Sequence, residues 1–235
     1  MTRSNTSPLL THPLAFIGGG NMARSLIGGL VKRGADPSRI RVAEPAEPLR
    51  AALAADFGVQ VFGEAGEAAY GADTWLFAVK PQVMRAVCEG LAPLAQSQRP
   101  LAVSIAAGIT TTQMQRWLRG GVPVVRSMPN TPALLGAGVT GLHASSEVDA
   151  AGRQRAELLL SAAGPTVWIE AEATMDAVTG VSGSGPAYVF LLAEAIETAA
   201  KAEGLSDEAA RTLVLQAVLG TGVTSLPYHH PLMVA

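Results

Sequence analysis

Short apolar runs alternate with amphipathic stretches over the first half of the chain. Six runs have the length and composition of buried strands, at positions 14–17, 40–43, 59–62, 75–79, 101–105 and 122–125. Amphipathic segments separate them, as at 22–33 and 49–57, and each of these two is followed by a glycine, as helix ends often are. Thr110 and Gln113 have the spacing of a capping box at the start of another helix. Strands that alternate with helices predict a parallel sheet with helices on both faces.

The second half of the chain changes character near residue 170. Two further apolar segments, 139–142 and 166–169, flank a predicted helix and extend the sheet. From Glu172 onward the pattern is helical and rich in alanine. We therefore predict an α/β fold with a doubly wound, Rossmann-type parallel sheet as a dinucleotide-binding domain over 1–170. A small, incomplete all-α domain over 171–235 is predicted to follow it.

Composition and charge narrow the class of partner. The chain has 235 residues, of which 49% are hydrophobic, enough for a sizeable buried core. Its 17 basic and 19 acidic side chains give a formal net charge of -2, without a basic run. Such a balance argues against nucleic acid and against an anionic membrane surface as partners. We expect a small-molecule ligand.

The single cysteine and the four histidines indicate the cellular compartment of the protein and whether it has a metal site. Cys88 is the only cysteine, so an intrachain disulfide is excluded and a reducing compartment fits best. The N-terminal segment lacks the pattern of a signal peptide, and no uncharged stretch resembles a membrane span. A cytoplasmic location is the expectation. His229 and His230 are adjacent and lack partner ligands at useful spacing, so no metal site is predicted.

A glycine-rich loop follows the first predicted strand. Gly18, Gly20 and Ala23 form a G-x-G-x-x-A pattern between that strand and a helix. In a dinucleotide-binding loop, the first glycine makes the tight turn, the second admits the pyrophosphate, and the small third residue lets helix and strand pack closely. The alternative is an ordinary glycine turn in a parallel sheet. The strand–turn–helix context favours dinucleotide binding.

Glu44 lies at the end of the second predicted strand, where such folds contact the adenosine ribose. A carboxylate there suits the free 2′-hydroxyl of NAD and repels the 2′-phosphate of NADP. Arg50 is close by on the next helix and can pair with a phosphate, which leaves the cofactor preference open. The competing interpretation is that Glu44 is a solvated loop charge.

A second glycine-containing loop, Val-Ser-Gly-Ser-Gly-Pro-Ala-Tyr at 181–188, leads directly into an apolar helix. Ser184 is expected to cap this helix, and Pro186 sits in its first turn, where a missing N–H costs little. A helix start of this kind presents unpaired N–H groups that attract anions. The alternative is a capped core helix that packs tightly against a neighbour.

Five segments together resemble a known family. They are Ile-Gly-Gly-Gly-Asn-Met at 17–22, Ala-Val-Lys-Pro-Gln at 78–82, Ser-Ile-Ala-Ala-Gly-Ile at 104–109, Arg-Ser-Met-Pro-Asn-Thr-Pro at 126–132, and the 181–188 loop. In order and spacing they resemble pyrroline-5-carboxylate reductase over roughly residues 13–220. The resemblance implies reduction of 1-pyrroline-5-carboxylate to L-proline with NADPH or NADH, the last step of proline biosynthesis. It also implies a helical dimerisation domain, and with it a homodimer or higher oligomer.

The same resemblance implies roles for individual residues. The predicted cofactor-binding residues are Gly18, Gly20, Asn21, Met22, Ala23, Glu44, Ala78, Val79, Lys80, Pro81, Ala106 and Gly108. The predicted substrate-binding residues are Met128, Pro129, Asn130, Ser184 and Gly185. Lys80 has the chemistry of a general acid, but the family implies a cofactor turn, and no residue is assigned a catalytic role. Hydride transfer to an imine needs alignment and exclusion of water rather than a strong nucleophile.

The C-terminal segment departs from the family. Family members carry a Val-Thr-Ser-Pro-Gly-Gly-Thr-Thr segment that holds the substrate, whereas this chain reads differently from Gly220 and contains Pro227 and Pro231. We expect no continuous helix there and a truncated or altered C-terminus. A catalytically impaired nucleotide-binding remnant is therefore the alternative function. A 3-hydroxy-acid dehydrogenase is disfavoured, because its catalytic lysine is matched only by Lys201, at the far end of the 187–202 helix.

Overall fold

The computed structural model describes residue 10 and residues 12–225, with backbone only for 223–225. The chain divides into two compact units, with the boundary between Gly183 and Ser184. The first unit contains the sheet and its covering helices. The second contains two helices. The predicted functional boundary near residue 170 stays a prediction.

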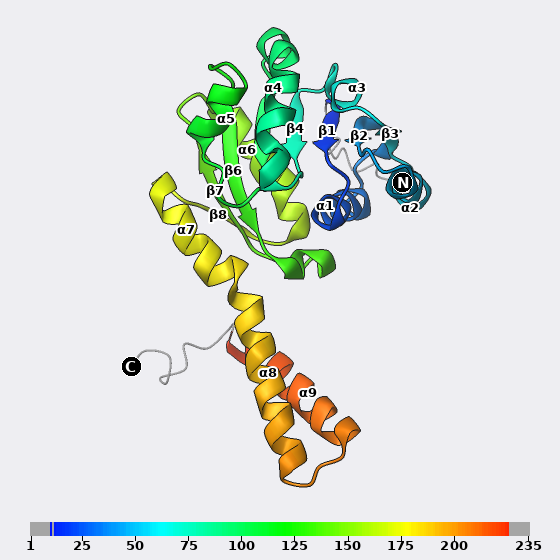
Figure 1. Ribbon diagram of the computed structural model, residues 1–235, viewed down its shortest axis with the longest axis vertical. Helices are drawn as coiled ribbons and strands as arrows, with labels where there is room; N and C mark the ends of the chain where they lie inside the picture. Colours follow the sequence, from blue (N-terminus) through cyan, green and yellow to red (C-terminus); the bar gives the residue numbers. More distant parts are fainter. Residues whose placement is uncertain (1–9, 11, 226–235) are drawn as a thin grey trace, which may run out of the picture. The chain divides into compact units, whose positions relative to one another are not determined.

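The first unit is built on one eight-stranded sheet within the described residues, in the order β3-β2-β1-β4-β5-β6-β7-β8 (Figure 1). The strands are β1 Leu14–Ile17, β2 Ile40–Ala43, β3 Gln60–Phe62, β4 Thr74–Phe77, β5 Leu101–Ser104, β6 Val124–Pro129, β7 Thr140–Ala144 and β8 Thr166–Trp168. All eight coincide with or overlap the strands predicted from the apolar runs. The strand order reverses beside β1, which is the ligand-binding point of a doubly wound sheet.

Helices cover both faces of this sheet. They are α1 Asn21–Lys32, α2 Glu47–Phe57, α3 Ala65–Ala69, α4 Pro81–Gln98, α5 Thr111–Trp117, α6 Ala150–Leu160 and α7 Met175–Val178. Successive strand residues point to opposite faces, so each face has its own apolar core. Leu14 and Phe16 share one core with α1, α2 and α6. Ala15 and Ile17 share the other with α3, α4 and α5. The predicted α/β fold is confirmed.

One pair of strands departs from the prediction of a wholly parallel sheet. β6 and β7 are antiparallel, with Met128 opposite Gly141 and Pro129 opposite Thr140. Met128 and Pro129 therefore lie within β6 rather than just past it. The connection between these strands contains only a short 3-10 helix, Thr131–Leu135, and it is too short for the helical crossover that a parallel pair needs.

Local signals fix most helix ends. The side chain of Thr110 accepts from the backbone N–H of Gln113, and the side chain of Gln113 accepts in return from the N–H of Thr110, so the predicted capping box is confirmed. Gly58 ends α2 in the left-handed conformation, with φ of 69°. Helix α3 was not predicted, since a five-residue helix is too short to show periodicity.

The second unit is a helical hairpin of α8, Gly185–Ala202, and α9, Asp207–Ser225. Lys201 pairs with Glu197 at 2.8 Å and with Asp207 at 3.3 Å, across the turn between them. The predicted cap from Ser184 is wrong: this residue occupies the N-cap position, but its side chain makes no capping bond. Large apolar side chains of α8 are exposed, namely Tyr188, Val189, Phe190, Leu191, Leu192 and Ile196.

Helix α9 continues through Gly220 to Ser225, although the sequence shows no helical pattern from Gly220 onward. The expectation of no continuous helix past Pro227 and Pro231 stays a prediction. Pro227, His229, His230 and Pro231 lie outside the described residues. None of the helices in the described part of the chain is long and apolar enough to span a bilayer.

Candidate cofactor and substrate site

The glycine loop after β1 is packed closely at its first position. The backbone N–H of Gly18 donates to the carbonyl of Ala43 at 2.8 Å, which ties the end of β1 to the end of β2. Gly18 has φ of +104°, and a Cβ added there would lie 2.6 Å from the carbonyl oxygen of Ala78. Only glycine satisfies both the backbone angle and this contact.

Two residues later the loop is open. A Cβ added at Gly20 would meet nothing within 4 Å. Gly20 is the N-cap residue of α1 and provides no side-chain cap, so the first-turn N–H groups of Asn21, Met22 and Ala23 have no capping partner from it. Ala23 is fully buried under the sheet. The close packing at Gly18, the free space at Gly20 and the uncapped start of α1 are the features expected of a pyrophosphate-binding loop.

Glu44 holds the glycine loop in place. Its Oε2 accepts from the backbone N–H of Gly19 at 2.9 Å, and its Oε1 accepts from the N–H of Ala46 at 3.0 Å. Arg50 in turn donates from Nη1 to the carbonyls of Glu44 at 2.7 Å and of Pro45 at 2.6 Å. Glu44 is therefore not simply a solvated loop charge. Its carboxylate is fixed beside the glycine loop, and Arg50 braces the turn that carries it.

The turns after β4 and β5 lie at the same carboxyl edge. The N–H of Ala78 donates to the carbonyl of Ile17 at 2.8 Å, so the segment that includes Val79 follows directly beside the glycine loop. Lys80 is the exposed N-cap residue of α4, and Pro81 begins that helix. After β5, Ala106 is buried and Gly108 has φ of +74°. The structure thus gathers the predicted cofactor residues along one edge of the sheet.

The predicted substrate residues on β6 contact a loop that is distant in sequence. Asn130 accepts at Oδ1 from the backbone N–H of Val139 at 2.9 Å and donates from Nδ2 to the carbonyl of Ser182 at 3.1 Å. A Cβ added at Gly183 would lie 2.7 Å from Cε of Met128, so strand and loop are in close contact. Ser184 and Gly185 begin the second unit, and their role at the substrate stays a prediction.

A charge cluster around the buried Arg126 lies one step back along β6. Arg126 is nearly buried, and it pairs through Nη2 with Asp176 at 3.0 Å and through Nη1 with Glu172 at 3.6 Å. Glu172 also accepts from the backbone N–H of Thr111 at 2.7 Å and from its hydroxyl at 2.8 Å. The sequence reasoning missed this cluster. Its signal was a single arginine in an otherwise apolar strand, because a buried charge requires partners.

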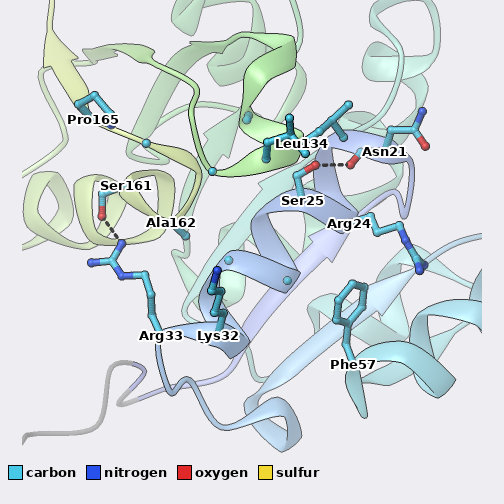
Figure 2. Close-up of a pocket in the computed structure, with 16 residues that line it drawn as sticks. Asn21, Arg24, Ser25, Lys32, Arg33, Phe57, Leu134, Ser161, Ala162 and Pro165 are labelled. Atoms are coloured by element: carbon cyan, nitrogen blue, oxygen red, sulfur yellow. Dashed lines mark hydrogen bonds between the residues drawn. The ribbon is translucent and has the colours of Figure 1, made fainter. Parts of the chain in front are cut away.

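A groove of about 900 Å³ runs along the outer side of α1. Figure 2 shows Arg24, Lys32 and Arg33 around it, with Arg33 donating to the hydroxyl of Ser161 at 2.8 Å. Among the predicted site residues only Asn21 lines this groove. It is therefore separate from the edge that gathers the other predicted cofactor residues.

Two further chemistries find no support among the described residues. No group of three or more His, Cys, Asp or Glu in this part of the chain could hold a metal ion. Burial raises the pKa of the Cys88 thiol to about 12, so this cysteine stays protonated and inert inside α4.

Known proteins match both halves of the chain. A family model described as NADP oxidoreductase, coenzyme F420-dependent, matches residues 13–108, and one described as pyrroline-5-carboxylate reductase dimerisation matches residues 172–233. The pyrroline-5-carboxylate reductase of Pseudomonas aeruginosa is 49% identical, covering 92% of this chain and 79% of the relative. The chain belongs to the pyrroline-5-carboxylate reductase family. The resemblance carried by the five sequence segments is confirmed.

Solved structures of this family share the fold. A pyrroline-5-carboxylate reductase from Coxiella burnetii is similar with a TM-score of 0.90 and 37% identity, covering 95% of this chain and 83% of that one. The Plasmodium falciparum pyrroline carboxylate reductase with NADP bound has a TM-score of 0.83 at 26% identity, covering 95% of this chain and 82% of that one. This reductase family therefore has the mostly parallel sheet seen here, followed by a helical domain.

Proposed function

We propose that this protein reduces 1-pyrroline-5-carboxylate to L-proline by hydride transfer from NADPH or NADH, the last step of proline biosynthesis. The observation that carries the proposal is the 49% identity to a pyrroline-5-carboxylate reductase over 92% of the chain. The shape of the glycine loop supports it, since the loop is closed at Gly18 and open at Gly20.

Different residues at the carboxyl edge of the sheet would bind different portions of the dinucleotide. Gly20 and the first turn of α1, Asn21 to Ala23, would bind the pyrophosphate, while Glu44 would face the adenosine ribose. The turn of Ala78, Val79, Lys80 and Pro81 would lie along the cofactor, and Ala106 and Gly108 would leave space for its nicotinamide ring. When bound, the cofactor supplies the hydride that reduces the protonated imine.

The chain's own contribution is alignment. Met128, Pro129 and Asn130 lie at the end of β6 and are proposed to form a substrate wall. Ser184 and Gly185, at the start of the second unit, are also proposed to bind the substrate. Packing of Met128 against Gly183 supports this assignment, because it joins the strand to the loop that leads into α8. Such a wall holds the ring in line with the hydride donor and sheds water, which is what the reaction requires.

The chain is further proposed to work as a homodimer or higher oligomer in the cytoplasm, without nucleic acid or membrane partners. The match of residues 172–233 to a dimerisation model supports the oligomer. So does the row of exposed apolar side chains on α8, because a helix with a large apolar surface needs a partner. The proposed division of labour is cofactor binding over 1–170 and dimerisation over 171–235.

The purified chain tests the proposal by spectrophotometry of NADPH and of NADH. Addition of 1-pyrroline-5-carboxylate is expected to oxidise the cofactor, with proline as the product. A 3-hydroxy acid with the oxidised cofactor serves as the control substrate and is expected to give no reduction. Cofactor binding without oxidation would contradict the reductase assignment and support the catalytically impaired remnant instead.

A further inference from the structure

Every second residue from Arg126 to Asn130, on β6 and directly after its end, contacts one segment, residues 172–183. Arg126 pairs with Glu172 and Asp176, Met128 packs against Gly183, and Asn130 donates to Ser182. The intervening Ser127 points the other way and donates from its hydroxyl to the carbonyl of Ser104 at 2.8 Å. One face of β6 therefore forms a continuous seat for the segment that leads into α8.

The end of that segment has an unusual backbone. Residues Thr179–Gly183 form a π-helix, a rare geometry that is frequent at functional sites. The hydroxyl of Ser182 donates back to the carbonyl of Val178 at 2.9 Å, while the carbonyl of Ser182 accepts from Asn130. Asn130 thus fixes the π-helical turn from outside.

The amide of Asn130 is matched to its two neighbours. The N–H of Val139 needs an acceptor, which Oδ1 of Asn130 supplies, and the carbonyl of Ser182 needs a donor, which Nδ2 supplies. Among side chains of this length, only the amide of asparagine offers both whatever the pH. The residue is nearly buried, at 9% exposure, so an unpaired neighbour would not be compensated by solvent.

We propose that Asn130 is a positioning residue of the reductase, which holds the Ser182 carbonyl and thereby keeps the 179–183 turn seated on Met128. The inference rests on the proposed function and deepens it. Asn130 bonds within the protein through both its amide nitrogen and its amide oxygen, so it positions this turn in addition to its proposed place beside the substrate. Arg126 anchors the other end of the same segment through Glu172 and Asp176.

Asn130→Asp separates the two hydrogen bonds. The introduced carboxyl keeps the acceptor for Val139, but when ionised it faces the carbonyl of Ser182 without a proton to donate. Burial and this carbonyl act to raise the pKa of the introduced carboxyl, whereas the N–H of Val139 acts to lower it, and the carboxyl regains the donor once the pH falls below that pKa. At about pH 8 we expect kcat/KM for pyrroline-5-carboxylate to fall about tenfold or more. The ratio of variant to parent is expected to recover toward one near about pH 5.5.

Two control variants isolate the effect. Asn130→Leu has similar size but no donor at any pH, so its ratio to the parent is expected to stay low and flat. Ser127→Ala removes a buried hydrogen bond from the opposite face of the same strand, and its ratio is expected to stay flat and close to one. For each cofactor, the dissociation constant of every variant is expected to stay within about twofold of the parent's value, because the turn lies outside the proposed cofactor contacts.

Hydrogen exchange of residues 172–183 gives a readout that does not depend on turnover. After correction for the intrinsic pH dependence of amide exchange, these residues are expected to exchange faster in Asn130→Asp than in the parent near about pH 8. Near about pH 5.5 they are expected to exchange at the parent's rate. The proposal would be overturned if Asn130→Asp had the parent's exchange rates and the parent's kcat/KM at high pH. It would also be overturned if the kcat/KM ratio of Asn130→Asp to the parent stayed as low and flat as that of Asn130→Leu. If the parent protein is inactive, the proposed function and the role of Asn130 in the reaction are overturned. Hydrogen exchange would then still show whether Asn130 anchors the 179–183 turn.

Discussion

The carboxylate of Glu44 accepts a hydrogen bond from the backbone N–H of Gly19 at 2.9 Å. A charged side chain at the end of β2 thus braces the loop after β1. The second carboxylate oxygen is held by the N–H of Ala46 at 3.0 Å, so the negative charge has a fixed place beside the proposed ribose position. This charge disfavours a 2′-phosphate, which makes Glu44 the natural residue on which to test the cofactor preference.

Glu44→Gln keeps one acceptor, enough for the N–H of Gly19 but not also for that of Ala46, and it removes the negative charge. The ratio of NADPH affinity to NADH affinity is expected to rise about fivefold to tenfold, because the repulsion of the 2′-phosphate is lost. Calorimetric dissociation constants for both cofactors measure this ratio. Glu47→Gln makes the same change of charge at the first residue of α2 and is the control, with little expected effect. An unchanged ratio in Glu44→Gln would place the ribose away from this side chain.

Alanine at Gly18 and alanine at Gly20 are expected to have different consequences. Gly18→Ala forces a Cβ to 2.6 Å from the carbonyl oxygen of Ala78 at φ of +104°, so the fold itself should suffer. A loss of about 2 kcal/mol or more in unfolding free energy is expected from urea denaturation.

Gly20→Ala is the matched variant, since its Cβ meets no protein atom within 4 Å. The unfolding free energy is expected to stay within about 1 kcal/mol of the parent, whereas cofactor affinity should fall about tenfold or more because the methyl group occupies the space of the pyrophosphate. Full cofactor affinity in this variant would show that the loop does not approach the dinucleotide.

Cys88 should be inert in the folded protein. Burial raises its thiol pKa to about 12, and the thiolate is the reactive form, so almost none is present at neutral pH. A chromogenic disulfide reagent at about pH 8 is expected to label one thiol per chain only as fast as the protein unfolds. Rapid labelling in native buffer, followed by mass spectrometry, would reveal an accessible cysteine.

Glu172→Ala should destabilise the first unit. It leaves the nearly buried Arg126 with one partner fewer and removes both acceptors of Thr111. We expect a loss of about 2–3 kcal/mol in unfolding free energy from urea denaturation. Asp176→Ala is the comparison, because the Asp176 side chain is 85% exposed and solvent screens its pair, so about 1 kcal/mol or less is expected. Equal losses would mean that the burial of Glu172 does not matter.

Much of the fold could be predicted because local patterns encode it. A strand buried on both faces of a parallel sheet must be apolar throughout, so β1 and β4 stand out as uninterrupted runs. The loop from Gly18 to Ala23 could be placed because the spacing of Gly18, Gly20 and Ala23 between a strand and a helix is a pattern within one short stretch of sequence. Thr110 and Gln113 signalled a helix start for the same local reason.

The contacts that were not predicted join segments far apart in sequence. Asn130 and Ser182 are 52 positions apart, and Arg126 and Asp176 are 50 apart, so no local pattern connects them. The antiparallel pairing of β7 also depends on how a ten-residue connection, 130–139, folds back, which apolar runs alone do not reveal. The chemistry of each residue was visible, but its partner was set by the tertiary fold.

Transfer of deuterium tests the central claim most directly. The purified chain is supplied with NADPH or NADH that carries deuterium on the transferred position of the nicotinamide, together with 1-pyrroline-5-carboxylate, and proline is recovered for mass spectrometry. We predict L-proline with one deuterium on the ring carbon that was the imine carbon. Recovery of unlabelled substrate from a chain that binds the cofactor would contradict the assignment as a pyrroline-5-carboxylate reductase.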